Sequence, residues 1–460
     1  MIVILYVMDA LRPDFLGCYG FTKNTSPNID ALARDSVLYE NAYATATWTK
    51  ASAASIVTSQ HPRTLRMMHQ MDVMPEYEAM LPKVLKKNGF KTYGISANAF
   101  FSPEFGFSGF DEFFVLQKDE KLLKERKEGK KPSHAETKIL EKLGIDKIVM
   151  VLSEDINEKI FPILEDGKEN KFIMAWSVDT HGPYYVRGKK SWFGNSSDDF
   201  ILEKEVNKEN LEKVKSLYCD MIRYNDYHLG KLISKLKKEG LYEDSLIIVT
   251  SDHGDSFGDH KTMLGKPIIG HTGIVYEEVI KVPLIIKYPK NKYAGMRCKE
   301  LVQLVDIYPT ILDVCGIQHN IEMEGISLAD TNNPRKDRVI FVESQLTPES
   351  TYSAAIRKGN YKLIKVENKL QMSLNLKKLT KSVLHKLQIP QIQLFNLETD
   401  PKERKNLKGR KDLIKQLLDE YNKRVKICNI KAERILIKRV VKKCIKVKTS
   451  RSEGDGKNVS

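Results

Sequence analysis

The stretch Ile2–Asp9 reads IVILYVMD, seven consecutive apolar residues that end at a carboxylate. A strand that is covered on both faces of a parallel sheet needs such an unbroken apolar run, because neither face meets water. Further strand-like stretches, largely apolar at their centres, lie at Lys91–Ser96, Lys171–Ser177, Ser245–Thr250 and Val282–Lys287. Helix-like stretches lie between them, at Pro27–Asp35, Glu78–Lys87 and Glu209–Lys238. The alternation predicts an α/β fold in which helices cover both faces of a mostly parallel sheet.

The composition of the 460-residue chain is that of a large globular protein. It is 41% hydrophobic and 29% charged, with 26 Gly and 17 Pro, which excludes collagen-like, coiled-coil and largely disordered chains. The six cysteines show no CxxC spacing, so we expect neither a zinc ribbon nor a disulfide framework. No apolar run reaches the ~18 residues of a membrane span, and the N-terminus lacks a basic leader and a cleavage site. These features predict a cytoplasmic protein.

The positive charge of the chain is concentrated near its C-terminus. Residues 402–448 contain 18 Lys and Arg against 5 Asp and Glu, which accounts for 13 of the net +15 charges. Because the body is nearly neutral, we do not expect nucleic acid as a partner. Helical spacing would place lysines opposite an apolar stripe of Ile437, Val440, Val441, Cys444 and Ile445. Two interpretations stay open: a helix that contacts an anionic membrane at its periphery, and a solvated helix packed on the body.

Changes in the length of the strand-like runs and in charge along the chain predict three parts. They are a catalytic core at residues 1–338, a small subdomain at 339–410 and a basic helical tail at 411–460. The tail is expected to be disordered from Arg451 onward. Four short strand-like runs predict an antiparallel α+β subdomain. They are Val339–Glu343, Tyr352–Arg357, Tyr361–Val366 and Gln393–Asn396. The Lys- and Glu-rich stretch Lys118–Lys147 is typical of a solvated helical insertion.

Acidic residues stand directly after three of the predicted strands. Asp9, Asp179 and Asp252 should therefore lie at the carboxyl edge of the sheet, where α/β proteins bind ligands. Asp9, Asp252 and the adjacent His253 provide two carboxylates and an imidazole, a ligand set that suits a hard or borderline divalent cation. A cation at this place can lower the pKa of a coordinated hydroxyl and prepare it for in-line attack.

Four stretches, taken together and in order, resemble the sulfatase family of the alkaline-phosphatase superfamily. They read VMDALRPD at 7–14, TWTKASAASIVTS at 47–59, VDTHGPY at 178–184 and TSDHGDSFGDH at 250–260. LVDIYPTIL at 304–312 and LFNLETDPKE at 394–403 look like later landmarks of the family. The resemblance extends from Ile2 to about Leu407 and implies an alkaline-phosphatase-like fold that hydrolyses sulfuric or phosphoric esters.

The resemblance implies that Thr49 is the nucleophile. Family members begin their C/S-x-P-S/A-R motif with the nucleophile, and counting back from Thr58 places that position at Thr49, where a following helix would contribute its N-terminal dipole. Here Thr49, Ala51 and Ala53 replace the Cys or Ser, Pro and Arg of the motif. Threonine cannot become formylglycine, so we expect no formylglycine and favour a phosphorus ester over a sulfate ester. The pattern is similar to phosphodiesterases and to phosphoglycerol or phosphoethanolamine transferases.

The resemblance also implies the other site residues. His181 would contact the transferred group or the leaving oxygen, Lys266 or His271 would bind substrate, and Asn98 lies where arylsulfatases carry a Gly-Lys-x-His element. A single metal site is favoured over a second one built from Asp179, His181 and His271. The expected metal ligands are Asp9, Thr49, Asp252 and His253. Family precedent indicates calcium, and the imidazole also permits Mn or Zn.

The sequence thus predicts a metal-dependent sulfatase-family hydrolase that cleaves a sulfate or phosphate ester through Thr49. The alternatives are a transferase of the phosphoglycerol or phosphoethanolamine type and a non-catalytic binding protein that retains the fold. The expected substrate is an anionic ester, with a glycan or a lipid-linked molecule as the two classes considered.

Overall fold

The structure is a computed structural model of the chain. It describes residues 1–116, 151–167, 169–188, 190–262, 265, 267–330, 337–348, 350–367 and 391–454, and side chains as far as residue 437. The insertion predicted at Lys118–Lys147 lies outside these residues, as does Lys266.

A nine-stranded sheet forms the core, in the order β11-β2-β12-β8-β1-β5-β3-β4, with β13 paired to β2. Its strands are β1 (Ile2–Met8), β2 (Val37–Tyr43), β3 (Phe90–Ser96), β4 (Glu112–Val115), β5 (Asn170–Ser177), β8 (Leu246–Thr250), β11 (Lys281–Val282), β12 (Leu284–Lys287) and β13 (Arg297–Gln303). The central strand β1 pairs in parallel with β5 and β8, and Ile4 lies beside Ile173 and Ile247. The predicted α/β fold class is confirmed.

Two strands of the sheet depart from the parallel arrangement. β11 runs antiparallel to β2, and β12 runs antiparallel to both β8 and β2. Between β8 and β12 the chain forms the loop after Thr250, the β9–β10 hairpin (Ser256–Lys261 and Pro267–Gly270) and the four-residue helix α9 (Glu277–Ile280). None of these elements crosses back over the sheet, so the chain re-enters from the carboxyl edge, which is possible only for an antiparallel strand.

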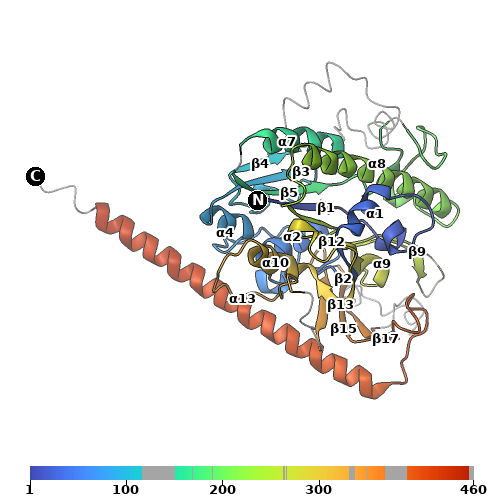
Figure 1. The fold of residues 1–460 in the computed structure, drawn as a ribbon. Coiled ribbons are helices and arrows are strands. Elements are labelled where there is room, and N and C mark those ends of the chain that lie inside the picture. Colours follow the sequence, from blue (N-terminus) through green and yellow to red (C-terminus); the bar gives the residue numbers. More distant parts are fainter. Residues whose placement is uncertain are drawn as a thin grey trace, which may run out of the picture.

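Helices cover both faces of this sheet (Figure 1). On one face α1 (Pro27–Arg34), α7 (Ser153–Glu165) and α8 (Leu211–Lys238) pack against alternate residues of β1, among them Ile4 and Tyr6. On the other face α2 (Thr49–Thr58), α4 (Leu81–Lys87) and α10 (Ile307–Val314) pack against Val3, Leu5 and Val7. Burial on both faces explains the unbroken apolar run at residues 2–8.

Shorter elements complete the core. They are α3 (Pro62–Leu65), β6 (Tyr184–Tyr185), β7 (Phe200–Ile201) and the 3-10 helices Pro13–Phe15, Gly17–Tyr19, Pro103–Phe105, Glu203–Glu205 (η5), Pro289–Asn291 and Leu304–Asp306. Among the described residues, no helix combines the length and apolar character needed to cross a bilayer.

A second, four-stranded antiparallel sheet follows the core. Its strands β14 (Val339–Ser344), β15 (Tyr352–Lys358), β16 (Tyr361–Glu367) and β17 (Ile392–Asn396) pair in sequence order. They lie close to the four runs expected from the sequence, which confirms the antiparallel subdomain. One face of the sheet packs against core residues that include Tyr43 and Tyr276. We propose that the core ends at residue 338 and the subdomain at residue 410, because β14 begins at 339 and α13 at 411.

Helix α13 (Lys411–Gly454) packs on the other face of this second sheet through its first half. Leu417, Tyr421 and Cys428 are buried there, whereas Leu436 and Ile437 are 41% and 62% exposed. Figure 1 shows the end of the helix running past the body. The helix continues to Gly454, beyond the expected start of disorder at Arg451. The stripe side chains from Val440 onward lie outside the described side chains.

Replacing Leu417 by Ala should destabilise the protein far more than replacing Leu436 on the same helix. Leu417 is 3% exposed in an apolar cluster, so its truncation should lower the free energy of unfolding by about 2–5 kcal/mol. Leu436→Ala should change it by less than about 0.5 kcal/mol. Urea denaturation followed by circular dichroism measures both. Equal losses from the two variants would contradict the docking of the first half alone.

Candidate active site

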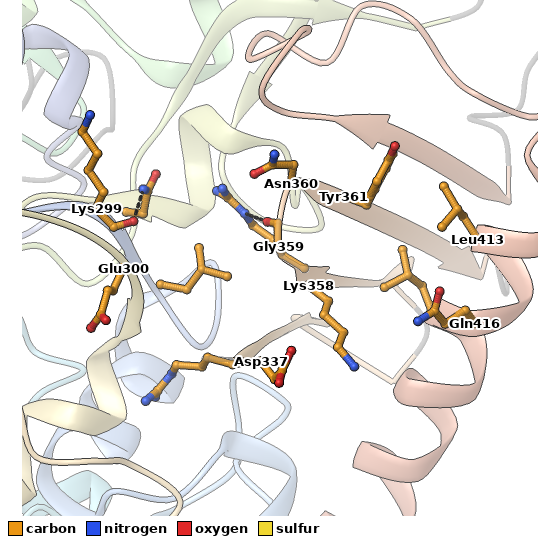
Figure 2. A pocket seen from close by; sticks show the side chains of 14 residues that line it. Lys299, Glu300, Asp337, Lys358, Gly359, Asn360, Tyr361, Leu413 and Gln416 are labelled. Carbon is orange, nitrogen blue, oxygen red and sulfur yellow. Dashed lines mark hydrogen bonds between the residues drawn. The ribbon is translucent and has the colours of Figure 1, made fainter. Parts of the chain in front are cut away.

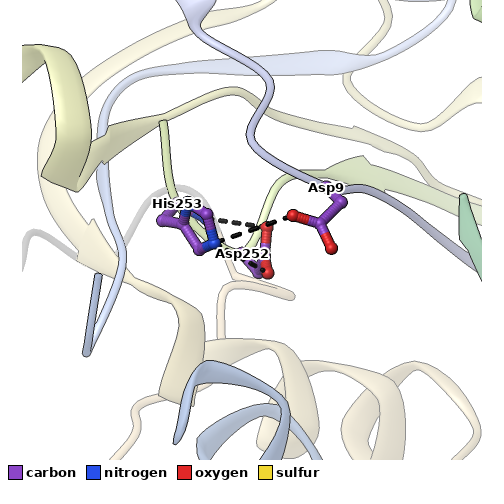
Figure 3. A group of neighbouring side chains, drawn as sticks. All are labelled: Asp9, Asp252 and His253. Carbon is purple, nitrogen blue, oxygen red and sulfur yellow. Dashed lines mark hydrogen bonds and ion pairs between the residues drawn. The ribbon is translucent and has the colours of Figure 1, made fainter. Parts of the chain in front are cut away.

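Two carboxylates and an imidazole meet at the carboxyl ends of β1 and β8 (Figure 3). Asp9 follows β1, and Asp252 and His253 follow β8. His253 Nε2 lies 3.6 Å from Asp9 Oδ1 and 3.4 Å from Asp252 Oδ2. All three side chains are fully buried. The structure thus assembles three of the four residues expected to bind a metal.

The three atoms that face one another have no hydrogen-bond partner: Asp9 Oδ1, Asp252 Oδ2 and His253 Nε2. The opposite atoms are engaged. His253 Nδ1 lies 2.8 Å from Gly254 O, and Asp252 Oδ1 accepts the backbone N–H groups of Ala10 and His253 at 3.2 and 3.0 Å. His253 therefore carries its proton on Nδ1 and offers a lone pair on Nε2. Buried polar atoms without a partner are costly, and a divalent cation would satisfy all three.

The electrostatics of the cluster point the same way. Burial, and next the charge of Asp9, raise the pKa of Asp252 to about 6, because two carboxylates in a dry site oppose each other's ionisation. A divalent cation between them would remove that repulsion. The residues present therefore fit a divalent metal ion.

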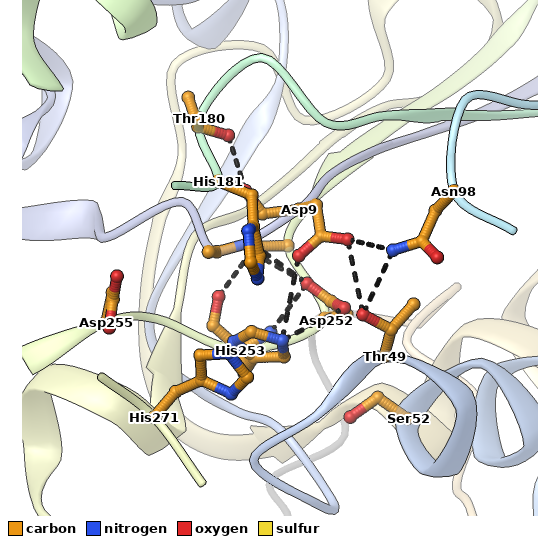
Figure 4. Close-up of polar contacts among 12 residues, drawn as sticks. Asp9, Thr49, Ser52, Asn98, Thr180, His181, Asp252, His253, Asp255 and His271 are labelled. Atoms are coloured by element: carbon orange, nitrogen blue, oxygen red, sulfur yellow. Dashed lines mark hydrogen bonds and ion pairs between the residues drawn. The ribbon is translucent and has the colours of Figure 1, made fainter. Parts of the chain in front are cut away.

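The hydroxyl of Thr49 lies beside this cluster (Figure 4). Thr49 is the first residue of α2, and its Oγ1 donates to Asp9 Oδ2 at 3.2 Å. Asn98 Nδ2 donates to the same Asp9 oxygen at 2.6 Å and to Thr49 Oγ1 at 3.2 Å. Asn98 Oδ1 accepts the N–H of Phe100 at 2.8 Å, which fixes the orientation of the amide. Asn98, the weakest of the sequence-based candidates, thus contacts both Thr49 and Asp9.

The neighbouring serines of α2 do not share this position. Ser52 Oγ donates to Ala46 O and Ser55 Oγ donates to Ala51 O, both at 3.3 Å. Their hydroxyls are buried and occupied with backbone carbonyls. Among the three hydroxyls considered, only that of Thr49 contacts the cluster.

Two further histidines line the same site. His271 stacks on His253 with ring centroids 4.2 Å apart, and its Nδ1 lies 2.7 Å from Thr47 O. Burial, together with His253 and His181, holds the pKa of His271 well below its usual value. His181 lies 5.4 Å from His271 between ring centroids. Burial opposes its charge, but the carboxylates of Asp9 and Glu203 outweigh burial and raise the pKa of His181 to about 9.

Two residues expected near the site, Asp179 and Lys266, are not among the side chains that the structure brings together there. Asp179 follows β5 at the same edge, yet its carboxylate accepts from Ser153 N at 3.2 Å and from the Ser153 hydroxyl. It is directed away from His181, so the two-metal alternative built on Asp179 has no support in the described residues. Lys266 lies outside those residues.

Sequence reasoning missed two residues that act on the site. Trp176 Nε1 donates to Asp9 Oδ2 at 3.3 Å from the neighbouring strand β5. An indole in a buried strand looks like core packing, so no separate sequence signal marked it. Glu203, the first residue of the 3-10 helix η5, contacts His181 at 3.4 Å. It lies 22 residues further along the chain, and this spacing does not indicate the contact.

A second group with metal-ligand character occurs within the described chain: His260, Glu278 and Glu403. Lys362 already lies 2.8 Å from Glu403 and 3.0 Å from Glu277, so a lysine ammonium supplies the positive charge there. The group joins the core to the second sheet and needs no cation. A cavity of about 730 Å³ lies elsewhere again, between β13, the β15–β16 turn and the start of α13 (Figure 2).

Comparisons with known proteins agree with the geometry. The family model "Sulfatase" matches residues 2–317, and "N-sulphoglucosamine sulphohydrolase, C-terminal" matches residues 271–430. An arylsulfatase of Clostridium perfringens is 26% identical over 480 residues, which cover 90% of this chain and 93% of the relative.

Solved structures share the fold. A phosphonate monoester hydrolase of Agrobacterium radiobacter superposes with a TM-score of 0.67 at 17% identity, over 94% of this chain and 95% of its own. A protein solved in complex with its substrate D-glucosamine-2-N,6-O-disulfate has a TM-score of 0.63 at 19% identity, over 92% and 98% of the two chains.

Protein purified without chelators should contain about one divalent ion per chain, and Asp252→Asn should lose it. The substitution removes a carboxylate charge from the described cluster in which all three buried ligand atoms lack a hydrogen-bond partner. Asp179→Asn is the matched control, because Asp179 faces Ser153, and it should keep the ion. Elemental analysis measures the metal content. Two ions per chain, or loss of metal in the control, would overturn the single-site assignment.

Proposed function

This chain belongs to the sulfatase family and is a sulfatase-like ester hydrolase, and we propose that it cleaves a phosphate or sulfate ester through Thr49 with a divalent metal ion. The observation that carries the proposal is the hydroxyl of Thr49, held 3.2 Å from Asp9 at the N-terminus of α2 and beside three ligand atoms without partners. Bound metal would lower the pKa of that hydroxyl and offset charge on the transferred group.

Individual side chains of the protein would carry out bond formation, positioning of the nucleophile and proton transfer. Thr49 Oγ1 gives up its proton along its hydrogen bond to Asp9 Oδ2 and forms the new bond to phosphorus or sulfur, while the bond to the ester oxygen breaks. Asn98 holds the nucleophile through its amide, and the free N–H groups at the start of α2 favour the anionic group. His181, 28% exposed and in contact with Glu203, gives a proton to the departing oxygen. Water then attacks the Thr49 ester and gives a proton to the neutral His181, while the departing Thr49 oxygen recovers its proton from Asp9.

We favour a phosphorus ester over a sulfate ester. A threonine ester must be released by a second attack, which is the normal course of covalent phosphoryl transfer. Ala51 and Ala53 also remove the Pro and the cationic Arg of the family motif, which weakens the support for a sulfate ester. A sulfated or phosphorylated glycan is the proposed substrate class, since one fold neighbour is described with a sulfated sugar. A lipid-linked ester is the alternative.

Transfer is the second candidate function. The same Thr49 ester could pass its group to an alcohol instead of water, as in phosphoglycerol or phosphoethanolamine transfer. Reading the chain as a non-catalytic binding protein accounts less well for the assembled ligand atoms. For the metal we propose calcium by family precedent; the nitrogen of His253 also accommodates Mn or Zn.

Replacing Thr49 by Ala should abolish turnover, with a loss of about 10³-fold or more, because it removes the nucleophile. The assay uses aryl phosphate, bis-aryl phosphodiester and aryl sulfate with Ca, Mg, Mn or Zn added. Ser52→Ala is the control, since Ser52 donates to Ala46 O, and it should stay within a few-fold of wild type. Phosphoryl activity above sulfuryl activity is expected. Inactivity of wild type on every ester would refute hydrolysis.

Thr49→Ser should keep part of the activity, because the hydroxyl survives. Quenching a slow substrate and mapping the peptides should find the adduct on Thr49. An adduct on Ser52 or Ser55 would show that the motif is misaligned.

We further propose that the end of α13 contacts anionic membranes. Residues 434–452 contain eight Lys and Arg and no Asp or Glu, and the helix has already left the body at Leu436 and Ile437. Full-length protein should sediment with vesicles containing phosphatidylserine and not with neutral ones, and binding should weaken with salt. A chain ending at Glu433 should lose binding and keep its stability. Equal sedimentation of both chains would contradict the proposal.

A further inference from the structure

The imidazole of His181 is held from one side. Its Nδ1 lies 2.9 Å from Gly182 O and 3.4 Å from Glu203 Oε1. Both neighbours accept hydrogen bonds, so the proton on this edge belongs to Nδ1. In the described part of the chain, His181 Nε2 makes no hydrogen bond to protein. The ring therefore has one edge fixed and the other left for substrate.

The local backbone is built to bring Glu203 to this place. A Cβ added to Gly182 would lie 2.6 Å from both Cγ and Oε1 of Glu203, so only glycine lets the carboxylate pack against residue 182. The strand pair β6–β7, in which Tyr184 pairs with Ile201, carries Glu203 back to His181. Arg187 braces the same loop, since its guanidinium donates to the carbonyls of residues 179, 181 and 183.

The charges around His181 single out Glu203. The groups that bear on the imidazole are the carboxylates Asp9, Glu203, Asp252 and Asp255, with the neighbouring histidines, His253 and His271, and Arg187. The charges of Asp9 and Asp252 are those that a bound cation would neutralise. Burial and Glu203 raise the pKa of Asp255 to about 6, and Asp255 accepts from Tyr184. Glu203 is the carboxylate in direct contact with the ring.

We propose that Glu203 is a positioning residue for His181. It fixes the imidazole with a proton on Nδ1 and stabilises the cation, so that Nε2 can protonate the departing oxygen. As the bond between that oxygen and phosphorus or sulfur breaks and the bond to Thr49 Oγ1 forms, the Nε2 proton moves to the oxygen and a neutral imidazole remains. The proposal rests on the proposed function of the same site.

The leaving group provides the test. Phenol is a poor leaving group with a pKa of about 10 and needs the proton, whereas a nitro-substituted phenol is more acidic and needs it less. With metal-loaded full-length protein, Glu203→Gln should lower kcat on the phenyl ester about 10- to 100-fold. On the 4-nitrophenyl ester it should lower kcat less than about threefold, and KM should change little for both.

Two further variants sharpen the test. Gly182→Ala should reproduce the split between the two esters, because its methyl group displaces Glu203 without removing a charge. Lys204→Ala, on the exposed neighbour of Glu203, is the control and should leave both esters unaffected. An equal loss of kcat on both esters in Glu203→Gln, or no loss on the phenyl ester, overturns the proposal.

A second readout needs no turnover and separates this proposal from the proposed function. ¹⁵N NMR of the imidazoles, with His181 assigned by His181→Gln, reports which ring nitrogen of His181 carries the proton. In Glu203→Gln the population of the Nδ1–H tautomer should fall, because the carboxylate that faces Nδ1 is gone. An unchanged tautomer overturns the positioning role, even if wild type hydrolyses neither ester.

Discussion

Two buried carboxylates at the ends of adjacent parallel strands are the constraint around which the site is organised. The register of β1 and β8 pairs Val7 with Thr250, so Asp9 and Asp252, each two residues further on, meet at the sheet edge. Asp9 divides its oxygens between two tasks. Oδ2 accepts from Thr49, Asn98 and Trp176, and Oδ1 has no partner. One carboxylate thus holds the hydroxyl of Thr49, the proposed nucleophile, with one oxygen and leaves the other free for a cation.

The sequence predicted those parts of the fold that carry a strong periodic signal. β1 and the central residues of β5 and β8 are apolar because both faces of these strands are buried, and the long helix α8 shows its amphipathic spacing. The direction of β12 could not be predicted, since it depends on the path of the chain after Thr250 and not on the composition of the strand. β2 was missed because Glu40 and Asn41 interrupt its apolar run near the sheet edge.

The site was predictable where a motif and a strand end coincide. Asp9, Asp252 and His253 satisfy that condition, whereas Thr49, at the N-terminus of α2, was placed by the motif alone. Asp179 also follows a strand, yet its carboxylate accepts a hydrogen bond from Ser153. The residues around Asp179 in the sequence do not predict this contact. Asn98 replaces a family element and so carried little weight, although its amide joins Thr49 to Asp9. The contact of Glu203 with His181 depends on how Glu203 packs against Gly182, a residue far from it in the sequence. Only the three-dimensional structure reveals this packing.

The second sheet does more than extend the core, because its first strand is joined to the segment that leads into Thr49. Ala46 bridges to Glu343 in β14, the N–H of Glu343 donates to Thr45 O, and the hydroxyls of Thr47 and Ser344 are hydrogen-bonded. The C-terminal part is therefore not a detachable module. A graft that cuts β14 would release the segment before Thr49 and displace the hydroxyl on which the proposed chemistry depends, however well the grafted part folded.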